Sequence, residues 1–245
     1  MEKLQKAQQV IEDVTGMTSH PVAVKLFAAV EPIDGFEAAP DRRYCQALME
    51  ARCGAKRLLS AENISCPAAA AAFGFKPLPE KLASGEMLVG YGIFESRAAG
   101  QATVNSMPRL EQKKWAMMAL CPLGDAPFEP DVIVAESLPE HLMWLALASV
   151  YDTGGRLPLS TAILQATCVD GMVIPFLEQR FNASLGCYGC RDATDIDNAE
   201  TVAGFPYKDL DRIVRNLEAL RVRTIPQVRK KSVYQALRKR TAGGD

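Results

Sequence analysis

Two apolar stretches decide the fold of this chain: WAMMALCPL at residues 115–123 and PDVIVAE at residues 130–136. Both are short apolar runs that end in turns, a pattern typical of buried strands. A third stretch, PVAVKLF at 21–27, alternates and is rich in valine, which predicts another strand. Further strands are expected at about 87–94 and 180–186. The centre of the protein is therefore predicted to be a sheet.

Helices are predicted around these strands. Residues 2–14 place apolar side chains at helical spacing, and PEHLMWLALASVYDTGG at 139–155 begins with a proline in its first turn and ends at two glycines. The segment 160–167 fits either a helix or a buried strand. Further helices are expected at residues 40–59, 66–73, 96–105, 207–220 and 226–240.

Length and composition favour a single folded domain. The 245 residues are 48% hydrophobic, which provides ample material for a core and excludes disorder. Helices and strands are mixed without strict alternation, so we predict an α+β or α/β fold, with one mixed sheet and peripheral helices over residues 1–245. Within it, residues 1–15 form an N-terminal helix, 16–206 the core, and 207–240 a helical basic segment.

The cellular setting is inferred from two further features of the sequence. No apolar run approaches the roughly 18 residues of a membrane span. The N-terminal stretch MEKLQKAQQVIEDV lacks the apolar middle of a secretory signal. We therefore expect a cytoplasmic protein that makes no contact with a membrane.

The net charge of −1 conceals an uneven distribution. Residues 207–240 hold eleven Lys or Arg and three Asp or Glu, a net of +8, so the remainder carries −9. A basic segment can contact nucleic acid, but no interleaved aromatic residues support this, and we favour a solvated helix face or a subunit contact. The same helices carry more apolar positions than one small core needs, which indicates a homodimer. These positions are Ile213, Leu217, Leu220, Val228 and Leu237.

Seven cysteines against two histidines is the most informative feature of the composition. In a reducing compartment these thiols are not expected to form a disulfide scaffold. The scarcity of histidine argues against a zinc hydrolase with histidine ligands and against a Cys–His hydrolase. A thiol-rich, histidine-poor sequence favours soft metal chemistry, above all iron–sulfur ligation.

The stretch LGCYGCR contains the one pair of cysteines with two-residue spacing, Cys187 and Cys190. This spacing is shared by zinc sites, iron–sulfur sites and redox dithiols. Two nearby glycines let the backbone fold tightly around a bound atom. Arg191 follows directly, and its guanidinium would lower the pKa of a neighbouring thiol or hold an anion.

The other cysteines differ in what their neighbours indicate. Cys66 precedes a proline at a predicted helix start, where the helix dipole favours a thiolate. Cys45 and Cys53 lie about two turns apart on one helix face, so at most one can reach a small cluster. Cys121 lies within a predicted apolar strand and is interpreted as a core residue. From the residues alone, Cys168 fits either packing or ligation.

Several short motifs, taken together, resemble one family over residues of about 20 to 220. They are PVAVKL (21–26), RYCQALMEARCG (43–54), ISCPAA (64–69), CPL (121–123), PDVIV (130–134), QATC (165–168), GCYGCR (186–191), Glu200 and GFP (204–206). The family is widespread in bacteria and archaea and is known as domain of unknown function number one hundred and sixty-nine. The resemblance implies family cysteines at the positions of Cys45, Cys66, Cys168 and Cys187, with Gly189 and Arg191 beside the last. It also implies that Cys53 and Cys190 are additions in this member.

The leading hypothesis is a protein that binds an iron–sulfur cluster, most simply a single 4Fe–4S cube. Cys45, Cys66 and Cys187 would be ligands, and Cys168 or Cys190 the fourth. If only three thiolates bind, the open iron could take a small anionic or sulfur-containing ligand, and the protein could be an enzyme. Arg191 would then orient the anion or donate a hydrogen bond to sulfur.

The alternative hypothesis is a metal-free protein that binds a small molecule or transfers a thiol. Cys187 or Cys190 would be the reactive thiol, activated by Arg191 and by a helix N-terminus. A third hypothesis, binding of nucleic acid by the basic C-terminal segment, predicts strongly salt-dependent association. The sequence favours it least.

Overall fold

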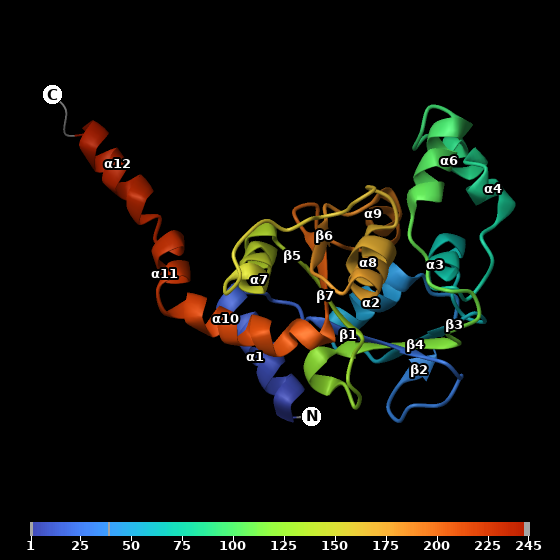
Figure 1. The fold of residues 1–245 in the computed structure, drawn as a ribbon, viewed down its shortest axis with the longest axis horizontal. Coiled ribbons are helices and arrows are strands. Elements are labelled where there is room, and N and C mark those ends of the chain that lie inside the picture. Colours follow the sequence, from blue (N-terminus) through green and yellow to red (C-terminus); the bar gives the residue numbers. More distant parts are fainter. Residues whose placement is uncertain (1, 39, 243–245) are drawn as a thin grey trace.

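The computed structural model describes residues 2–38 and 40–242. Within these residues, seven strands form one mixed sheet in the order β2-β3-β4-β1-β5-β7-β6 (Figure 1). Neighbouring strands are antiparallel, apart from the parallel pair β2 and β3. The strands are β1 (Val22–Phe27), β2 (Glu37–Ala38), β3 (Arg57–Ser60), β4 (Met117–Pro122), β5 (Val132–Ser137), β6 (Asn182–Ser184) and β7 (Thr201–Pro206). The single mixed sheet with surrounding helices confirms the predicted α+β class.

Helices cover both faces of the sheet. One face packs against α1 (Glu2–Thr15), α7 (Pro139–Val150) and α10 (Leu210–Val222). The other face packs against a second group of short helices (Figure 1). This group comprises α2 (Tyr44–Arg52), α3 (Pro67–Ala72), the π-helix η2 (Ala166–Val173), α8 (Ile174–Glu178) and α9 (Tyr188–Ala193).

Two parts of the chain lie beside this layered body. Between α3 and β4 the chain forms an excursion of three helices, α4 (Glu80–Ala83), α5 (Glu86–Gly90) and α6 (Arg97–Ser106). After α10, the helices α11 (Thr224–Arg229) and α12 (Ser232–Ala242) extend away from the body (Figure 1). Two short 3-10 turns, η1 (Leu123–Asp125) and η3 (Tyr207–Asp209), complete the described elements. No helix among the described residues has both the length and the apolar character needed to cross a membrane.

The alternation of side chains along the strands divides the core into two clusters. In β1, Val22 and Val24 contribute to the cluster beneath α2 and η2, whereas Ala23 contributes to the cluster beneath α1 and α7. All six residues of β4 and of β5 are buried, because each strand is covered on both faces. The short apolar runs of the sequence therefore correspond to strands with helices above and below them.

Several predicted elements differ in the structure. The helix predicted over 40–59 ends at Arg52, because Gly54 turns the chain at a φ of +109° and residues 57–60 pair with β4. The strand predicted at 87–94 is the helix α5 followed by a turn. The segment 160–167, left open by its periodicity, is irregular until η2 begins at Ala166. Residues 201–206, for which no strand was predicted, form β7.

The apolar positions of the C-terminal helices divide into two groups. Ile213, Leu217 and Leu220 are buried within the core of the same chain, so they are not free for a subunit contact as the sequence suggested. Val228 and Leu237 are half-exposed. The predicted helix over 226–240 is two helices, α11 and α12, which meet near Lys231 at a φ of +49°.

Candidate functional site

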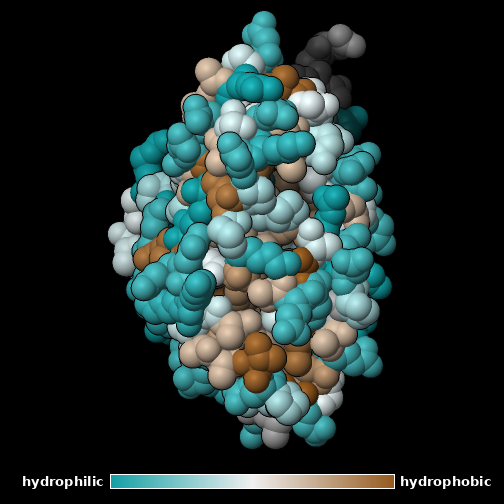
Figure 2. All heavy atoms as spheres, turned by 90° about the vertical axis from the view of Figure 1, so that its right-hand side faces the viewer, coloured by the Kyte–Doolittle hydropathy of each residue, from teal (hydrophilic) through white to brown (hydrophobic). Residues whose placement is uncertain are grey.

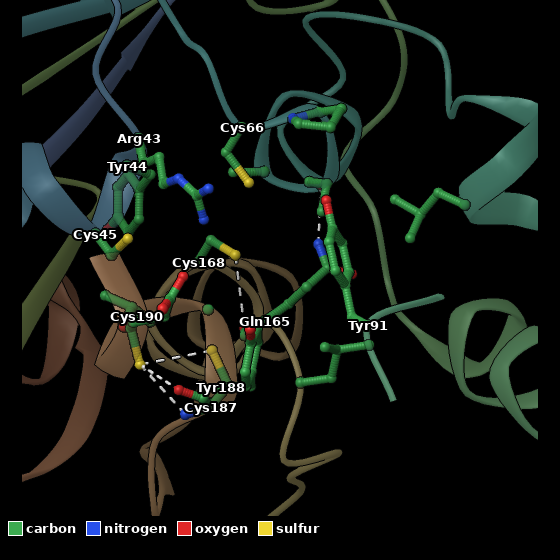
Figure 3. A pocket seen from close by; sticks show the side chains of 18 of the residues that line it. Arg43, Tyr44, Cys45, Cys66, Tyr91, Gln165, Cys168, Cys187, Tyr188 and Cys190 are labelled. Atoms are coloured by element: carbon green, nitrogen blue, oxygen red, sulfur yellow. Dashed lines mark hydrogen bonds between the residues drawn. The ribbon is translucent and has the colours of Figure 1, made fainter. Parts of the chain in front are cut away.

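A cavity of about 250 Å³ lies between the α4–α5 excursion and the helices α2, α3, η2 and α9. The five cysteines that the sequence groups into one site all line it: Cys45, Cys66, Cys168, Cys187 and Cys190 (Figure 3). The two remaining cysteines do not line the cavity. Cys53 is exposed after α2, and Cys121 is buried in the core on the opposite face of the sheet.

The five thiols belong to α2, α3, η2 and α9. In α2, α3 and α9 a cysteine lies at the N-terminus of the helix. Cys45 is the second residue of α2, Cys66 directly precedes α3, and Cys187 directly precedes α9. Pro67 can begin α3 because the first helical N–H needs no partner within the helix. The free N–H groups of a helix start favour negative charge, so the backbone here suits thiolates.

Cys187 and Cys190 form a close pair at the start of α9. Their Sγ atoms lie 3.5 Å apart, and the Cys187 N–H donates a 3.2 Å hydrogen bond to Cys190 Sγ. Cys190 N–H in turn donates to Cys187 Sγ. The hydrogen bond between the two thiols lowers the pKa of Cys187 below the ordinary 9.0. The same bond, together with burial, raises the pKa of Cys190.

The thiols of Cys45 and Cys168 are held in the protonated form by their surroundings. Burial, followed by the nearby Cys66 and Cys190, raises the pKa of Cys45 to about 12. Burial also raises the pKa of Cys168 well above its usual range. Because a buried thiolate without a counter-charge is costly, these groups need a cation before they lose their protons.

The π-helix η2 is an unusual element, and it positions Cys168. It begins after Gln165, a non-glycine residue in the left-handed region at a φ of +56°. The Gln165 side chain donates a 2.9 Å hydrogen bond to the carbonyl of Ala68, which joins η2 to α3 across the cavity. Cys168 Sγ lies 3.6 Å from the Gln165 carbonyl (Figure 3). Strained backbone and π-helical turns recur at functional sites, because the surrounding structure must support them.

The two arginines near the thiols have different roles. Arg191, the residue expected to contact an anion or a sulfur atom, does not line the cavity. Its guanidinium donates to the carbonyls of Leu185, Asp197 and Glu200, and therefore holds the loop around α9. Arg43 lines the cavity instead, one residue before α2, and its guanidinium extends among the thiols (Figure 3).

Behind the thiols lies a buried charged cluster. Glu136 on β5 is only 2% exposed, and burial raises its pKa to about 8, an effect that Arg52 opposes. The Arg52 guanidinium lies 3.7 Å from Glu136 and 2.9 Å from Glu200. Tyr44 and Thr167 line the cavity, and their buried hydroxyl oxygens have no hydrogen-bond partner among the described residues. Two buried hydroxyls without partners indicate that the wall is shaped for bound water or a ligand.

The thiols that line the cavity are a donor set that fits an iron–sulfur cluster. A single ion such as zinc requires thiolates at about 2.3 Å, and no group of His, Cys, Asp or Glu in the described ranges is placed to hold one. A four-iron cluster spreads its ligands because each thiolate binds a different iron. The chemistry of the donors, five thiols and no histidine around one cavity, fits that group.

Some residues of the cavity were not anticipated from the sequence. Arg43 stands within the motif around Cys45, and its position next to a candidate ligand was a usable signal. Tyr91 and Tyr188 stack at a ring-centroid distance of 6.5 Å although 97 residues separate them in the chain. Nothing local in the sequence indicates that pair, because it depends on how the excursion folds back on α9.

Comparisons with known proteins agree with the motifs. Residues 10–216 match the family DUF169, described as "Uncharacterised ArCR". A curated relative, an uncharacterised protein of Methanocaldococcus jannaschii, is 33% identical over 204 residues, which cover 82% of this chain and 87% of the relative. No solved structure matches the chain significantly. The matched family is the one that the sequence motifs resemble.

Proposed function

The chain belongs to the DUF169 family, and we propose that its cavity binds a 4Fe–4S cluster through Cys45, Cys66, Cys168 and Cys187. Cys190 is the alternative fourth ligand. The observation that carries the proposal is the meeting of five thiols from α2, α3, η2 and α9 at one cavity. Packing alone does not explain this, because the five cysteines come from four separate segments of the chain.

The protonated state of Cys45 and Cys168 supports a soft metal cation as the ligand of this cavity. Burial keeps Cys45 and Cys168 protonated, so neither is a ready nucleophile in the metal-free protein. Metal binding displaces thiol protons and supplies the missing positive charge. The backbone N–H groups at the starts of α2, α3 and α9 then face the negative charge of the bound thiolates.

A bound cluster would supply electron transfer, or an open iron if one thiolate does not bind. The chain's own residues hold and shield it. Apolar side chains of the excursion, including Leu82 and Leu88, cover one side of the cavity and limit the access of water. The guanidinium of Arg43 provides a positive charge on the opposite side.

Single substitutions test the ligand set. We expect Cys45→Ser, Cys66→Ser, Cys168→Ser and Cys187→Ser to lose most of the iron bound after anaerobic purification, because serine is a poor ligand for this cluster. Cys53→Ser and Cys121→Ser are the matched controls and should retain it, since neither lines the cavity. Equal iron content in all six variants would contradict the proposed ligands.

A second candidate function rests on the close pair at α9. Opposed pKa shifts and an Sγ–Sγ distance of 3.5 Å are typical of a redox dithiol. Cys187 thiolate would attack a substrate disulfide and release one thiol. Cys190 would then attack the mixed disulfide, which forms a Cys187–Cys190 disulfide and releases the second thiol. Catalysed disulfide reduction by iron-free protein would favour this function over cluster binding.

We also propose a homodimer in a reducing, cytoplasmic setting. Val222 and Val233 are 83% and 77% exposed on the C-terminal helices, and Tyr234 is 57% exposed. The segment 207–240 carries a net charge of +8 and the rest of the chain −9. A second copy therefore offers an acidic surface to this basic, partly apolar segment. The sequence supports the reducing setting, because its cysteines do not follow the pattern of a disulfide scaffold.

A further inference from the structure

Arg43 is a cation without a carboxylate partner inside the thiol-lined cavity. Within the described part of the chain it takes part in no ion pair, and its guanidinium donates no hydrogen bond. Its neighbour Arg42, by contrast, pairs with Glu50 at 2.9 Å outside this cavity. A half-buried guanidinium that faces a cavity is a site for a planar oxyanion, which it binds with two parallel N–H donors.

The wall contributed by the excursion is apolar. Leu82, Met87, Leu88 and Ile93 line the cavity, and Leu82 and Leu88 are buried in the core. Elsewhere on the face that carries the excursion, apolar side chains gather only in small patches among polar ones (Figure 2). The concentration of apolar side chains inside the cavity thus forms a surface for the apolar body of a ligand.

Two exposed tyrosines stand where the excursion meets α9. The rings of Tyr91 and Tyr188 are stacked with an interplanar angle of 26°, and both residues line the cavity. They are 61% and 51% exposed, so they lie at its mouth (Figure 3). Aromatic side chains at this position can pack on a ligand while their hydroxyls stay in water.

We propose that this cavity binds a small carboxylate with an apolar body. The carboxylate lies on the Arg43 guanidinium, and the apolar body lies against Met87 and Leu88 under the two tyrosines. The buried hydroxyls of Tyr44 and Thr167, which have no partner among the described residues, are further donors on the same wall. The inference deepens the proposed function, because it names the ligand class for the same thiol-lined site.

Two features of the cavity limit which carboxylates can bind. The volume of about 250 Å³ is below the usual range for drug-sized ligands, so the ligand is small. Asp192 also lines the cavity, but it is exposed and its charge is screened by solvent. The charge that an incoming carboxylate meets in the half-buried part of the cavity is therefore that of Arg43.

Calorimetric titration of the full-length reduced protein tests the inference. The probes are benzoate, hexanoate, the uncharged benzamide and inorganic phosphate. We expect benzoate or hexanoate to bind with a Kd of about 1 mM or tighter, and benzamide and phosphate to bind at least about tenfold more weakly. Arg43→Gln should weaken carboxylate binding by about tenfold or more, while Arg42→Gln, the matched control, should leave it unchanged.

Several outcomes would overturn the inference. One is no carboxylate binding at the stated affinity, and another is equal binding of benzoate and benzamide. Tighter binding of phosphate than of benzoate would show that the apolar wall does not contribute to the affinity. If Arg43→Gln lowers the iron content but not the affinity for benzoate, the arginine serves the cluster rather than a ligand.

Iron and sulfide measured on the same preparations separate this inference from the proposed function. Carboxylate binding that depends on Arg43, in protein that contains no iron after anaerobic purification, would support the ligand and contradict the cluster. Iron-loaded protein that binds no carboxylate would support the cluster and contradict the ligand. Tyr91→Ala serves as a second variant, since it alters the mouth without touching a thiol. We expect it to weaken benzoate binding about threefold to tenfold.

Discussion

Cys187 and Cys190 show how a local contact gives two identical side chains different chemistry. Each accepts a hydrogen bond from the backbone N–H of the other, and their sulfur atoms are 3.5 Å apart. In the reduced pair one thiol must donate and the other accept, which favours the thiolate at Cys187. The pKa of Cys187 is therefore lowered, whereas the pKa values of Cys45, Cys168 and Cys190 are raised.

This difference predicts the pH dependence of alkylation in metal-free protein. The rate at Cys187, followed by peptide mass spectrometry, should reach half its plateau below pH 9.0, whereas the rate at Cys45 should still rise well above it. Cys190→Ala removes the hydrogen-bond donor and should move the Cys187 midpoint upward. Coincident profiles for Cys187 and Cys45 would contradict the assignment.

Glu136 predicts how stability depends on pH in the metal-free protein. Its pKa is raised from 4.5 to about 8 by burial, so between these values the folded protein keeps a proton that the unfolded chain releases. The free energy of unfolding therefore falls as the pH rises through this window, by up to about 5 kcal/mol. Arg52 remains paired with Glu200 when Glu136 is replaced.

Glu136→Gln should flatten this dependence, which urea unfolding at pH 5, 7 and 9 would measure. The variant should match the wild type at pH 5 and exceed it at pH 9. Glu62→Gln on the surface is the control, and it should follow the wild type throughout. A Glu136→Gln variant that loses stability at pH 9 would show that the carboxylate, rather than the protonated acid, stabilises the fold.

At the residue scale the sequence predicted the set of thiols but not their surroundings. Residue type and helix starts grouped Cys45, Cys66, Cys187 and Cys190, because thiols are rare and their neighbours are informative, and the family resemblance added Cys168. Arg191 was expected to contact an anion or a sulfur atom because it directly follows Cys190. In the structure its guanidinium instead donates hydrogen bonds to backbone carbonyls. Adjacency in sequence does not determine on which side of a helix a long side chain lies.

Among the elements, η2 depends on close contact with β7. A Cβ atom added to Gly204 would lie 1.8 Å from the carbonyl oxygen of Gly171 and 3.2 Å from Pro175. We expect Gly204→Ala to lower the free energy of unfolding by about 2–4 kcal/mol, because backbone must move to accommodate the methyl group. Since η2 carries Cys168, the variant should also lose bound iron.

Gly90→Ala provides the control for this substitution. Its Cβ would meet nothing within 4 Å, and its φ is not in the left-handed region, so its stability should change by less than about 1 kcal/mol. Denaturant unfolding monitored by circular dichroism compares the two variants. Equal stability of Gly204→Ala and the wild type would mean that η2 can shift away from β7 freely.

Two of the mispredicted elements are short, and short segments show no clear periodicity. Residues 57–60 are too few to show a period, and their pairing with β4 is a contact between distant parts of the chain. Residues 86–90 form a short helix whose buried Leu88 gives it the apolar character of a strand. Longer elements such as α1 and α7 were predicted closely, because several turns of periodicity specify a helix.

For the molecule as a whole, the charge distribution and the extended C-terminal helices predict self-association. Light scattering should give twice the mass of one chain, and the dimer should weaken with added salt because the proposed contact pairs basic and acidic surfaces. Val233→Asp should produce monomers, whereas Val30→Asp, in a loop where the side chain is 69% exposed, should not. A wild-type monomer at every concentration would contradict the proposal.

The arrangement of strands and helices in space was the feature that the sequence predicted least. The mixed class followed from the order of apolar runs, but the strand order β2-β3-β4-β1-β5-β7-β6 depends on pairings between distant segments. The same holds for the cavity, to which the α4–α5 excursion contributes an entire wall. Folding brings this wall opposite the thiols, and no local pattern around residues 82–93 indicates it.

The central claim is that the cavity holds an iron–sulfur cluster, and anaerobic purification followed by iron, sulfide and absorbance measurements tests it most directly. We expect brown protein with about four irons and four sulfides per chain and a broad visible absorption that bleaches on reduction. The Cys53→Ser variant should give the same values. Colourless protein without iron, obtained under the same conditions and with all thiols reduced, would contradict the claim.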